Sequence, residues 1–143
     1  MKALIDTCII IDALQERIPF AENAKKIFIA SANRHFDGFI TAKSIADIYY
    51  LIHRYTHSDA KTRKILDDLF TIFEISDTTA IDCKLALLSE VSDYEDAIMI
   101  ESAISSGMDC IVTRNIKDYA KSKIPVYTPE NFLELIQEHS DVE

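Results

Sequence analysis

Short apolar runs alternate with amphipathic segments from one end of the chain to the other, and this order restricts the fold more than any other feature. An apolar run bounded by turn residues is typical of a buried parallel strand, whereas apolar residues three and four apart indicate a helix. The pattern predicts strands over residues 3–5, 38–41, 71–75, 110–113 and 125–127. It predicts helices over residues 19–32, 44–55, 59–70, 81–88, 93–107 and 129–138. We therefore expect an α/β fold of three α/β/α layers, with a central parallel sheet of about four to five strands.

The length of 143 residues suits a single domain, expected over residues 1–139, with residues 140–143 as a frayed tail. Three cysteines without CxxC spacing indicate reduced thiols in a cytoplasmic protein. No apolar run approaches the ~20 residues of a membrane span. The first 14 residues hold two aspartates where a signal peptide would be apolar, so no secretion signal is expected.

The glycine count and the charge exclude several function classes. With Gly38 and Gly107 as the only glycines, the chain has no dinucleotide-binding fingerprint, no P-loop and no GxSxG nucleophile elbow. A net charge of −9 argues against a passive nucleic-acid binder, which is normally basic. It leaves open an enzyme that holds divalent cations beside phosphates, because the ions supply the positive field.

Acidic residues fall where the predicted strands end and helices begin. Asp6 ends the first strand, Asp47 and Asp96 lie in first helical turns, and Asn115 and Asp118 follow the fourth strand. In an open parallel sheet these positions meet at the carboxyl edge, where ligands bind. Grouped carboxylates repel one another unless a cation neutralises them, and oxygen-only ligands favour Mg²⁺ or Mn²⁺. Alternatively, Asp47 and Asp96 only stabilise their helices by interaction with the helix dipole, and Asp118 is a solvated loop residue.

Three further polar residues carry structural expectations. Ser44 is predicted to cap the helix that begins there, and Asp93 to cap the helix before Gly107. Asp12 is expected to face solvent on a helix that follows the first strand.

Four motifs in order resemble those of one protein family. Residues 3–7 resemble the opening of PIN-domain ribonucleases, in which a small polar residue follows a metal-binding aspartate. Residues 40–48 resemble the second motif of that family, and residues 95–98 resemble its third, an Asp-Ala at a helix start. Residues 112–119 resemble the fourth motif, and residues 129–133 the closing helix. The resemblance covers essentially the whole chain, with the short form typical of VapC-type toxins and related stand-alone bacterial PIN proteins.

The resemblance implies a Mg²⁺- or Mn²⁺-dependent endoribonuclease, the toxin of a toxin–antitoxin pair. It implies RNA as substrate, a small antitoxin as partner, and a homodimer. The implied catalytic residues are Asp6, Asp47, Asp96 and Asp118, with Asp6 and Asp96 as the metal ligands. The residues implied to support them by hydrogen bonds are Thr7, Ser44 and Asn115.

Two positions depart from the family pattern. Position 47 is Asp where the family usually has Glu, so its carboxylate reaches about one methylene less far. Position 115 is Asn where many members have a fourth acid, which removes a charge. These departures support an alternative, a PIN-like module that binds RNA or protein without turnover.

A basic stretch lies between His53 and Lys64. Arg54, Arg63 and Lys64 are candidates for binding RNA phosphates, and a solvated helical face is the alternative. His53 and His57 stand four apart, but without the glutamate of HExxH they do not predict a zinc enzyme.

Two other hypotheses concern partners and a different protein class. Tyr49, Tyr50 and Tyr55 are candidate antitoxin contacts, with burial in the core as the alternative. A receiver domain also uses strand-end aspartates, but residues 75–77 fit its phosphoacceptor strand poorly.

Overall fold

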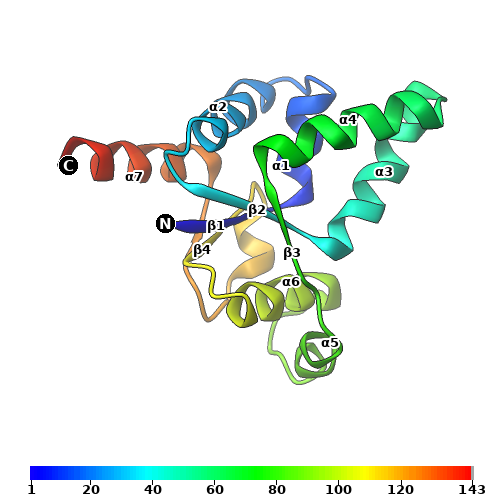
Figure 1. The fold of residues 1–143 in the computed structure, drawn as a ribbon. Coiled ribbons are helices and arrows are strands. Elements are labelled where there is room, and N and C mark those ends of the chain that lie inside the picture. The colour runs from blue at the N-terminus through cyan, green and yellow to red at the C-terminus, as the bar shows by residue number, and fades with distance from the viewer. Residues whose placement is uncertain (143) are drawn as a thin grey trace.

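The computed structural model describes residues 1–142, with side chains described through Ser140. Figure 1 shows a sheet with helices on both of its faces. The strands are β1 (Lys2–Ile5), β2 (Asp37–Thr41), β3 (Glu74–Ser76), β4 (Cys110–Val112) and β5 (Val126–Tyr127). The helices are α1 (Thr7–Leu14), α2 (Ala21–Ala32), α3 (Ala42–Thr56), α4 (Asp59–Ile72), α5 (Ala80–Ala86), α6 (Tyr94–Ser105) and α7 (Pro129–Val142), with a 3-10 turn, η1, at Ile116–Tyr119.

The five strands form one parallel sheet in the order β3-β2-β1-β4-β5, which confirms the predicted α/β class. β1 lies in the centre, with Leu4 opposite Phe39 of β2 on one side and Ile111 of β4 on the other. Burial on both faces explains why β1 is continuously apolar from Ala3 to Ile5 rather than alternating.

Successive side chains of the central strands enter two different cores. Ala3 and Ile5 pack with apolar residues of α1, α2, α3, α4 and α7. Leu4 and Ile111 point to the other face and pack against Met99 and Ala103 of α6. The protein therefore has the three predicted layers, with α5 and α6 grouped on the face opposite α1–α4 (Figure 1).

Several predicted boundaries are wrong by a few residues: α2 begins at Ala21 rather than at 19, α5 ends at Ala86 rather than at 88, and three others follow. α3 begins at Ala42, with Thr41 as the N-cap whose side chain accepts from the Ser44 amide, so Ser44 is not the cap. α4 continues to Ile72, so the third strand starts at Glu74 rather than at 71. α7 extends to Val142 rather than ending near 138. The frayed tail at 140–143 stays a prediction, and Glu143 lies outside the described residues.

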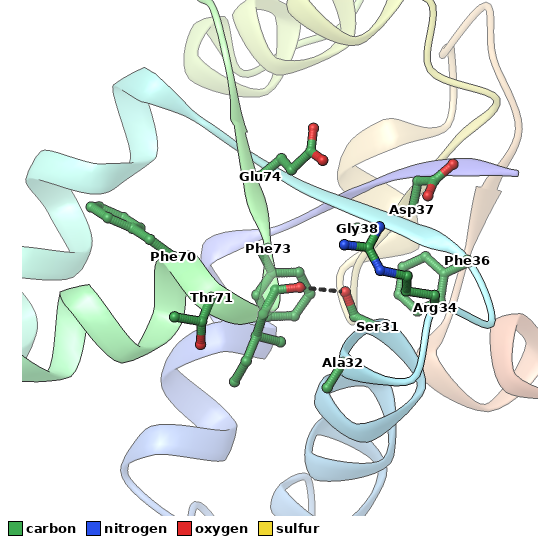
Figure 2. Close-up of a pocket in the computed structure, with 11 residues that line it drawn as sticks. Ser31, Ala32, Arg34, Phe36, Asp37, Gly38, Phe70, Thr71, Phe73 and Glu74 are labelled. Atoms are coloured by element: carbon green, nitrogen blue, oxygen red, sulfur yellow. Dashed lines mark hydrogen bonds between the residues drawn. The ribbon is translucent and has the colours of Figure 1, made fainter.

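The amino edge of the sheet contains a cavity of about 200 Å³ beside the starts of β2 and β3 (Figure 2). Ser31 donates a hydrogen bond of 2.8 Å from Oγ to the Ile72 carbonyl and so ties α2 to the end of α4. Gly38 lies against this contact, and a Cβ there would stand 2.5 Å from Ser31 Oγ and 2.6 Å from the Phe73 ring. A glycine is needed here because the backbone of β2 approaches α2 closely.

Among the helices described, none has the length and apolar character to cross a membrane.

Candidate functional site

The carboxyl edge of the sheet holds a cavity of about 250 Å³, at the end opposite Gly38. Four carboxylates and one lysine line it, from the end of β1, the first two turns of α3 and the first turn of α6: Asp6, Asp47, Glu95, Asp96 and Lys43. The prediction that Asp47 lies in the first turn of its helix is wrong, because α3 begins at Ala42 and its first turn holds no acid. Thr7 and Ser44 also line this cavity. The structure thus brings together five of the residues singled out from the sequence: Asp6, Thr7, Ser44, Asp47 and Asp96.

Asp6 is held by the strand that neighbours it. Its amide donates to the Val112 carbonyl at 3.0 Å, and its Oδ2 accepts a 2.7 Å hydrogen bond from Thr113 Oγ1. Thr113 is fully buried and was not among the predicted site residues. The register of β1 with β4 pairs Ile5 with Val112, so the next residues, Asp6 and Thr113, fall side by side. Sequence alone does not supply that register.

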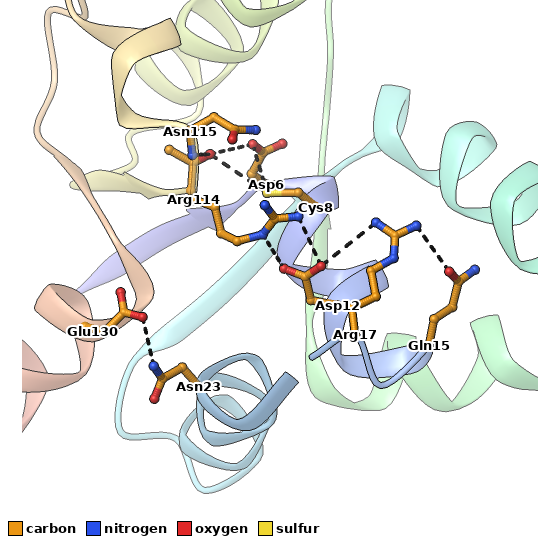
Figure 3. Close-up of polar contacts among 10 residues, drawn as sticks. Asp6, Cys8, Asp12, Gln15, Arg17, Asn23, Arg114, Asn115 and Glu130 are labelled. Carbon is orange, nitrogen blue, oxygen red and sulfur yellow. Dashed lines mark hydrogen bonds and ion pairs between the residues drawn. The ribbon is translucent and has the colours of Figure 1, made fainter. Parts of the chain in front are cut away.

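Cys8 lies beside the same carboxylate. Its Sγ is 3.5 Å from Asp6 Oδ2 (Figure 3). Burial and the nearby Asp6 charge raise the pKa of the Cys8 thiol to about 11, so the thiol stays protonated and donates to the carboxylate. Within residues 1–142, Asp6 therefore accepts two side-chain donors on Oδ2 and none on Oδ1.

Asp96 lies in the first turn of α6, where its amide donates to the Asp93 side chain at 3.0 Å, which confirms Asp93 as the N-cap. Burial raises the pKa of the Asp96 carboxyl to about 6, and the negative charges of Asp93, Asp6 and Asp118 contribute to this rise. This concentration of like charge makes a cation the most favourable partner for the carboxyl.

Tyr119, at the end of η1, adds a buried polar group to the same region. Only 3% of it is exposed, and its hydroxyl makes no hydrogen bond of standard geometry within residues 1–142. Burial and the charges of Asp6 and Asp96 raise the pKa of Tyr119, while its hydroxyl lowers the pKa of Asp96, so the phenol faces the two carboxylates. Buried hydroxyls are normally hydrogen-bonded, and the group within reach of this one is the Asp96 carboxylate.

Lys43 was not predicted as a site residue. Its Nζ donates to Asp47 Oδ2 at 3.0 Å and to Glu95 Oε2 at 3.2 Å, and so joins α3 to α6 across the cavity. Burial opposes the charge, but hydrogen bonds to Asp47 and Glu95 raise the pKa of the Lys43 ammonium. Asp47 therefore lines the acidic cavity as predicted, but its carboxylate is paired with a lysine.

The remaining predicted residues occupy less central positions. Ser44 Oγ lies 2.8 Å from Thr41 Oγ1 and points to the start of its own helix rather than to a carboxylate. Asn115 and Asp118 are exposed, at the start of η1 and within it, and do not line the cavity. Asn115 donates its amide to Thr113 Oγ1 at 3.1 Å, which links it to the hydroxyl that holds Asp6.

The expectation that Asp12 faces solvent is wrong, because only 1% of Asp12 is exposed. Arg114 donates to both of its carboxylate oxygens, at 2.5 Å and 3.2 Å (Figure 3). The same guanidinium stands 4.0 Å from the centre of the Phe20 ring. This bidentate ion pair holds Arg114 against α1 and so restrains the loop beside Asp6.

The basic stretch is mostly paired with acids on its own helix. Arg63 binds Asp59 at 2.8 Å and Lys64 binds Asp68 at 2.8 Å, one turn apart in each case. Arg54 lies 5.7 Å from the centre of the Tyr50 ring.

The three tyrosines differ in exposure. Tyr50 and Tyr55 are 62% and 72% exposed, so they are not core residues. Tyr49 is half-buried, hydrogen-bonds to Asp59 and stacks on His53.

A preformed cage of three or more His, Cys, Asp or Glu side chains is not found within the described part of the chain. Mg²⁺ does not require one, because it keeps several waters and binds proteins through one or two carboxylates. The oxygen ligands offered by Asp6 and Asp96 and the like-charge repulsion at Asp96 fit such a hydrated ion.

Comparisons with known proteins agree with this fold. The family model described as PIN domain matches residues 2–117. A chain of VapBC2 from Rickettsia felis, solved with a DNA fragment of its promoter, superposes with a TM-score of 0.66 at 17% identity, over 90% of this chain and 98% of that one. VapC20 from Mycobacterium tuberculosis, described as a sarcin-ricin loop cleaving toxin, gives 0.60 at 14% identity, over 76% and 86%. PAE2754 from Pyrobaculum aerophilum gives 0.63 at 17% identity, over 96% and 90%. No curated protein matches the sequence.

Proposed function

The chain belongs to the PIN domain family, and from that membership we propose that it is a Mg²⁺- or Mn²⁺-dependent endoribonuclease. The observation that carries the proposal is the meeting of Asp6 and Asp96 in one cavity, where burial and like charges raise the pKa of Asp96. Two carboxylates that repel each other at a sheet's carboxyl edge favour a divalent cation between them.

In this proposal Asp6 and Asp96 hold the ion. When bound, the ion lowers the pKa of water and stabilises negative charge that develops on a phosphodiester. Thr113 and Cys8 donate to one oxygen of Asp6 and keep the carboxylate in one orientation. Asp118, which lies outside the cavity lining but close enough for its charge to act on Asp96, is proposed to orient the attacking water or take its proton, because Asp47 is paired with Lys43.

The test is cleavage of a labelled RNA by the purified protein. We expect cleavage with Mg²⁺ or Mn²⁺, none in excess EDTA, and recovery when the ion is restored. Asp6→Asn should lose cleavage, and Glu138→Gln, an exposed change on α7, should not. Undiminished cleavage in EDTA, or by Asp6→Asn, would contradict the mechanism.

We also propose that the protein is a cytoplasmic toxin, forms a homodimer and binds a small antitoxin. The proposal is supported by the VapBC complex and the cleaving toxin that share this fold. The exposed Tyr50 and Tyr55 on α3 are the proposed antitoxin contacts. Co-expression with a short neighbouring reading frame should yield a co-purifying complex, and Tyr50→Ser with Tyr55→Ser should weaken it. Light scattering of the isolated chain should give twice its mass.

A second candidate is a PIN-like module that binds RNA or protein without turnover. It is favoured by the neutral Asn115, the Lys43–Asp47 pair and the lack of a three-acid cage within residues 1–142. Calorimetric titration with Mn²⁺ separates the two candidates, because the module requires no ion and the nuclease requires one.

A further inference from the structure

The contacts of Lys43 go beyond those of an ordinary ion pair on the surface of one helix. An ammonium paired with an acid four residues on is common on helices and contributes little. Here the same Nζ also reaches Glu95, 52 positions away on α6, at 3.2 Å. Its side chain is 30% exposed and forms part of the lining of the acidic cavity.

The charges of the cavity fall into two pairs. Asp47 and Glu95 share the Lys43 ammonium. Asp6 and Asp96 receive only uncharged donors among the contacts of the described residues, from Thr113 and Cys8 on Asp6. Lys43 is the one cation in the described lining, so the protein itself compensates the charge on the Asp47–Glu95 side only.

We propose that Lys43 is the permanent second cation of this site: it occupies the Asp47–Glu95 side of the cavity and limits the chain to one divalent ion, held by Asp6 and Asp96. This inference rests on the proposed metal-dependent function. In two-metal sites a second ion stabilises one of the two oxygens of the displacement. A lysine ammonium is a compact, strongly hydrated point charge, so it supplies part of that field.

The decisive measurement is the number of Mn²⁺ ions bound per chain, by calorimetry and by electron paramagnetic resonance of the free ion. Wild type should bind one. Lys43→Met, which keeps an unbranched side chain one atom shorter and without charge, should bind two, because Asp47 and Glu95 become free to hold an ion. Adding Glu95→Gln to Lys43→Met should return the number to one, which would locate the second ion.

Two variants control for charge and for folding. Lys43→Arg keeps a cation in place and should bind one ion. Lys26→Met removes a lysine from a pair with Glu22 one turn away on α2, outside the cavity, and should also bind one. Cleavage gives a second readout: Lys43→Met should lose at least tenfold in kcat at limiting Mn²⁺ and recover most of it at high Mn²⁺.

The outcomes separate this inference from the proposed function. Two ions on wild type, or one ion on a folded Lys43→Met with unchanged Mn²⁺ dependence, would overturn the role of Lys43 and leave the nuclease intact. No ion on wild type would overturn the nuclease proposal itself.

Discussion

Replacement of Asp96 by Asn distinguishes two roles for this residue: a metal ligand, or an acid that only stabilises the start of α6. The Asp93 side chain caps α6 through the backbone amide of residue 96, and the substitution leaves that amide in place. Asn removes one negative charge from a cavity in which burial and neighbouring acids raise the pKa of Asp96 from 3.8 to about 6. The metal-free protein should therefore become more stable, not less.

The pH dependence follows from the direction of that pKa. Because the folded pKa lies above the unfolded one, the carboxyl's contribution to stability is complete below pH 3.8 and is lost as the pH rises through about 6. The full difference corresponds to at most about 3 kcal/mol. Asp96 is only half-buried, and solvent screening reduces the expected gain of Asp96→Asn at pH 7.5 to about 1 kcal/mol. For a domain of this size that gain is roughly 3 °C in melting temperature.

The assay is a set of melting curves between pH 5.5 and 8, with and without Mn²⁺. The advantage of Asp96→Asn should grow as the pH rises through about 6. At a Mn²⁺ concentration of 100 times Kd, wild type should gain about 2.7 kcal/mol, and the variant far less. Asp77→Asn, an exposed change in the loop after β3, is the control and should track wild type. Equal stabilisation of both proteins by Mn²⁺, with equal cleavage, would refute the placement of the site.

Three other variants, one of them a triple substitution, test separate parts of the structure. Alanine at Arg54, Arg63 and Lys64 should weaken RNA binding and make its salt dependence less steep, by about 0.7 in slope for each phosphate that the protein no longer neutralises. Because two of these cations are already paired with acids, we expect a decrease equivalent to about one phosphate. An unchanged slope would show that this helical face is only solvated. Asp12→Ala should lower the free energy of unfolding by about 3 kcal/mol in urea melts, since it leaves a half-buried guanidinium unpaired, and a decrease below 1 kcal/mol would contradict this. Gly38→Ala should lower the free energy of unfolding by about 2 kcal/mol because its Cβ would lie 2.5 Å from a hydroxyl oxygen. An unchanged free energy of unfolding would mean that α2 can move away from β2 without loss of stability.

The order of strands and helices could be predicted because the local pattern of apolar residues indicates the type of each element. The run from Ala3 to Ile5 is apolar on both faces only if both faces are covered, as they are in the parallel sheet. The errors lie at boundaries where two conformations have nearly equal energies. Thr41 and Ser44 both carry the hydroxyl of an N-cap, and Ile72 with Phe73 satisfies a helical pattern as well as a strand.

The location of the candidate site could be predicted for a topological reason. Parallel strands end at one edge, so Asp6 and the first turns of α3 and α6 had to meet there. The contacts among those residues could not, because they depend on register and side-chain rotamers. Thr113 reaches Asp6 only because β4 pairs with β1 in a given register. Lys43 is long enough to contact both Asp47 on its own helix and Glu95 on another, and the sequence does not show that it reaches the second.

The burial of Asp12 could have been predicted from its apolar neighbours in the sequence, although the periodicity of the helix does not indicate it. It lies within Cys-Ile-Ile-Ile-Asp-Ala-Leu, a stretch apolar on all sides, and a helix of that kind is buried all round. A carboxylate in such a helix loses its water and must be neutralised by a cation close by. Two segments can supply that cation: Arg114 comes directly after β4, which neighbours the central strand, and Arg17 follows the same helix and lies 3.9 Å from Asp12. Burial of a charge thus predicts that a cationic partner exists, even where the spacing of residues does not predict which residue it is.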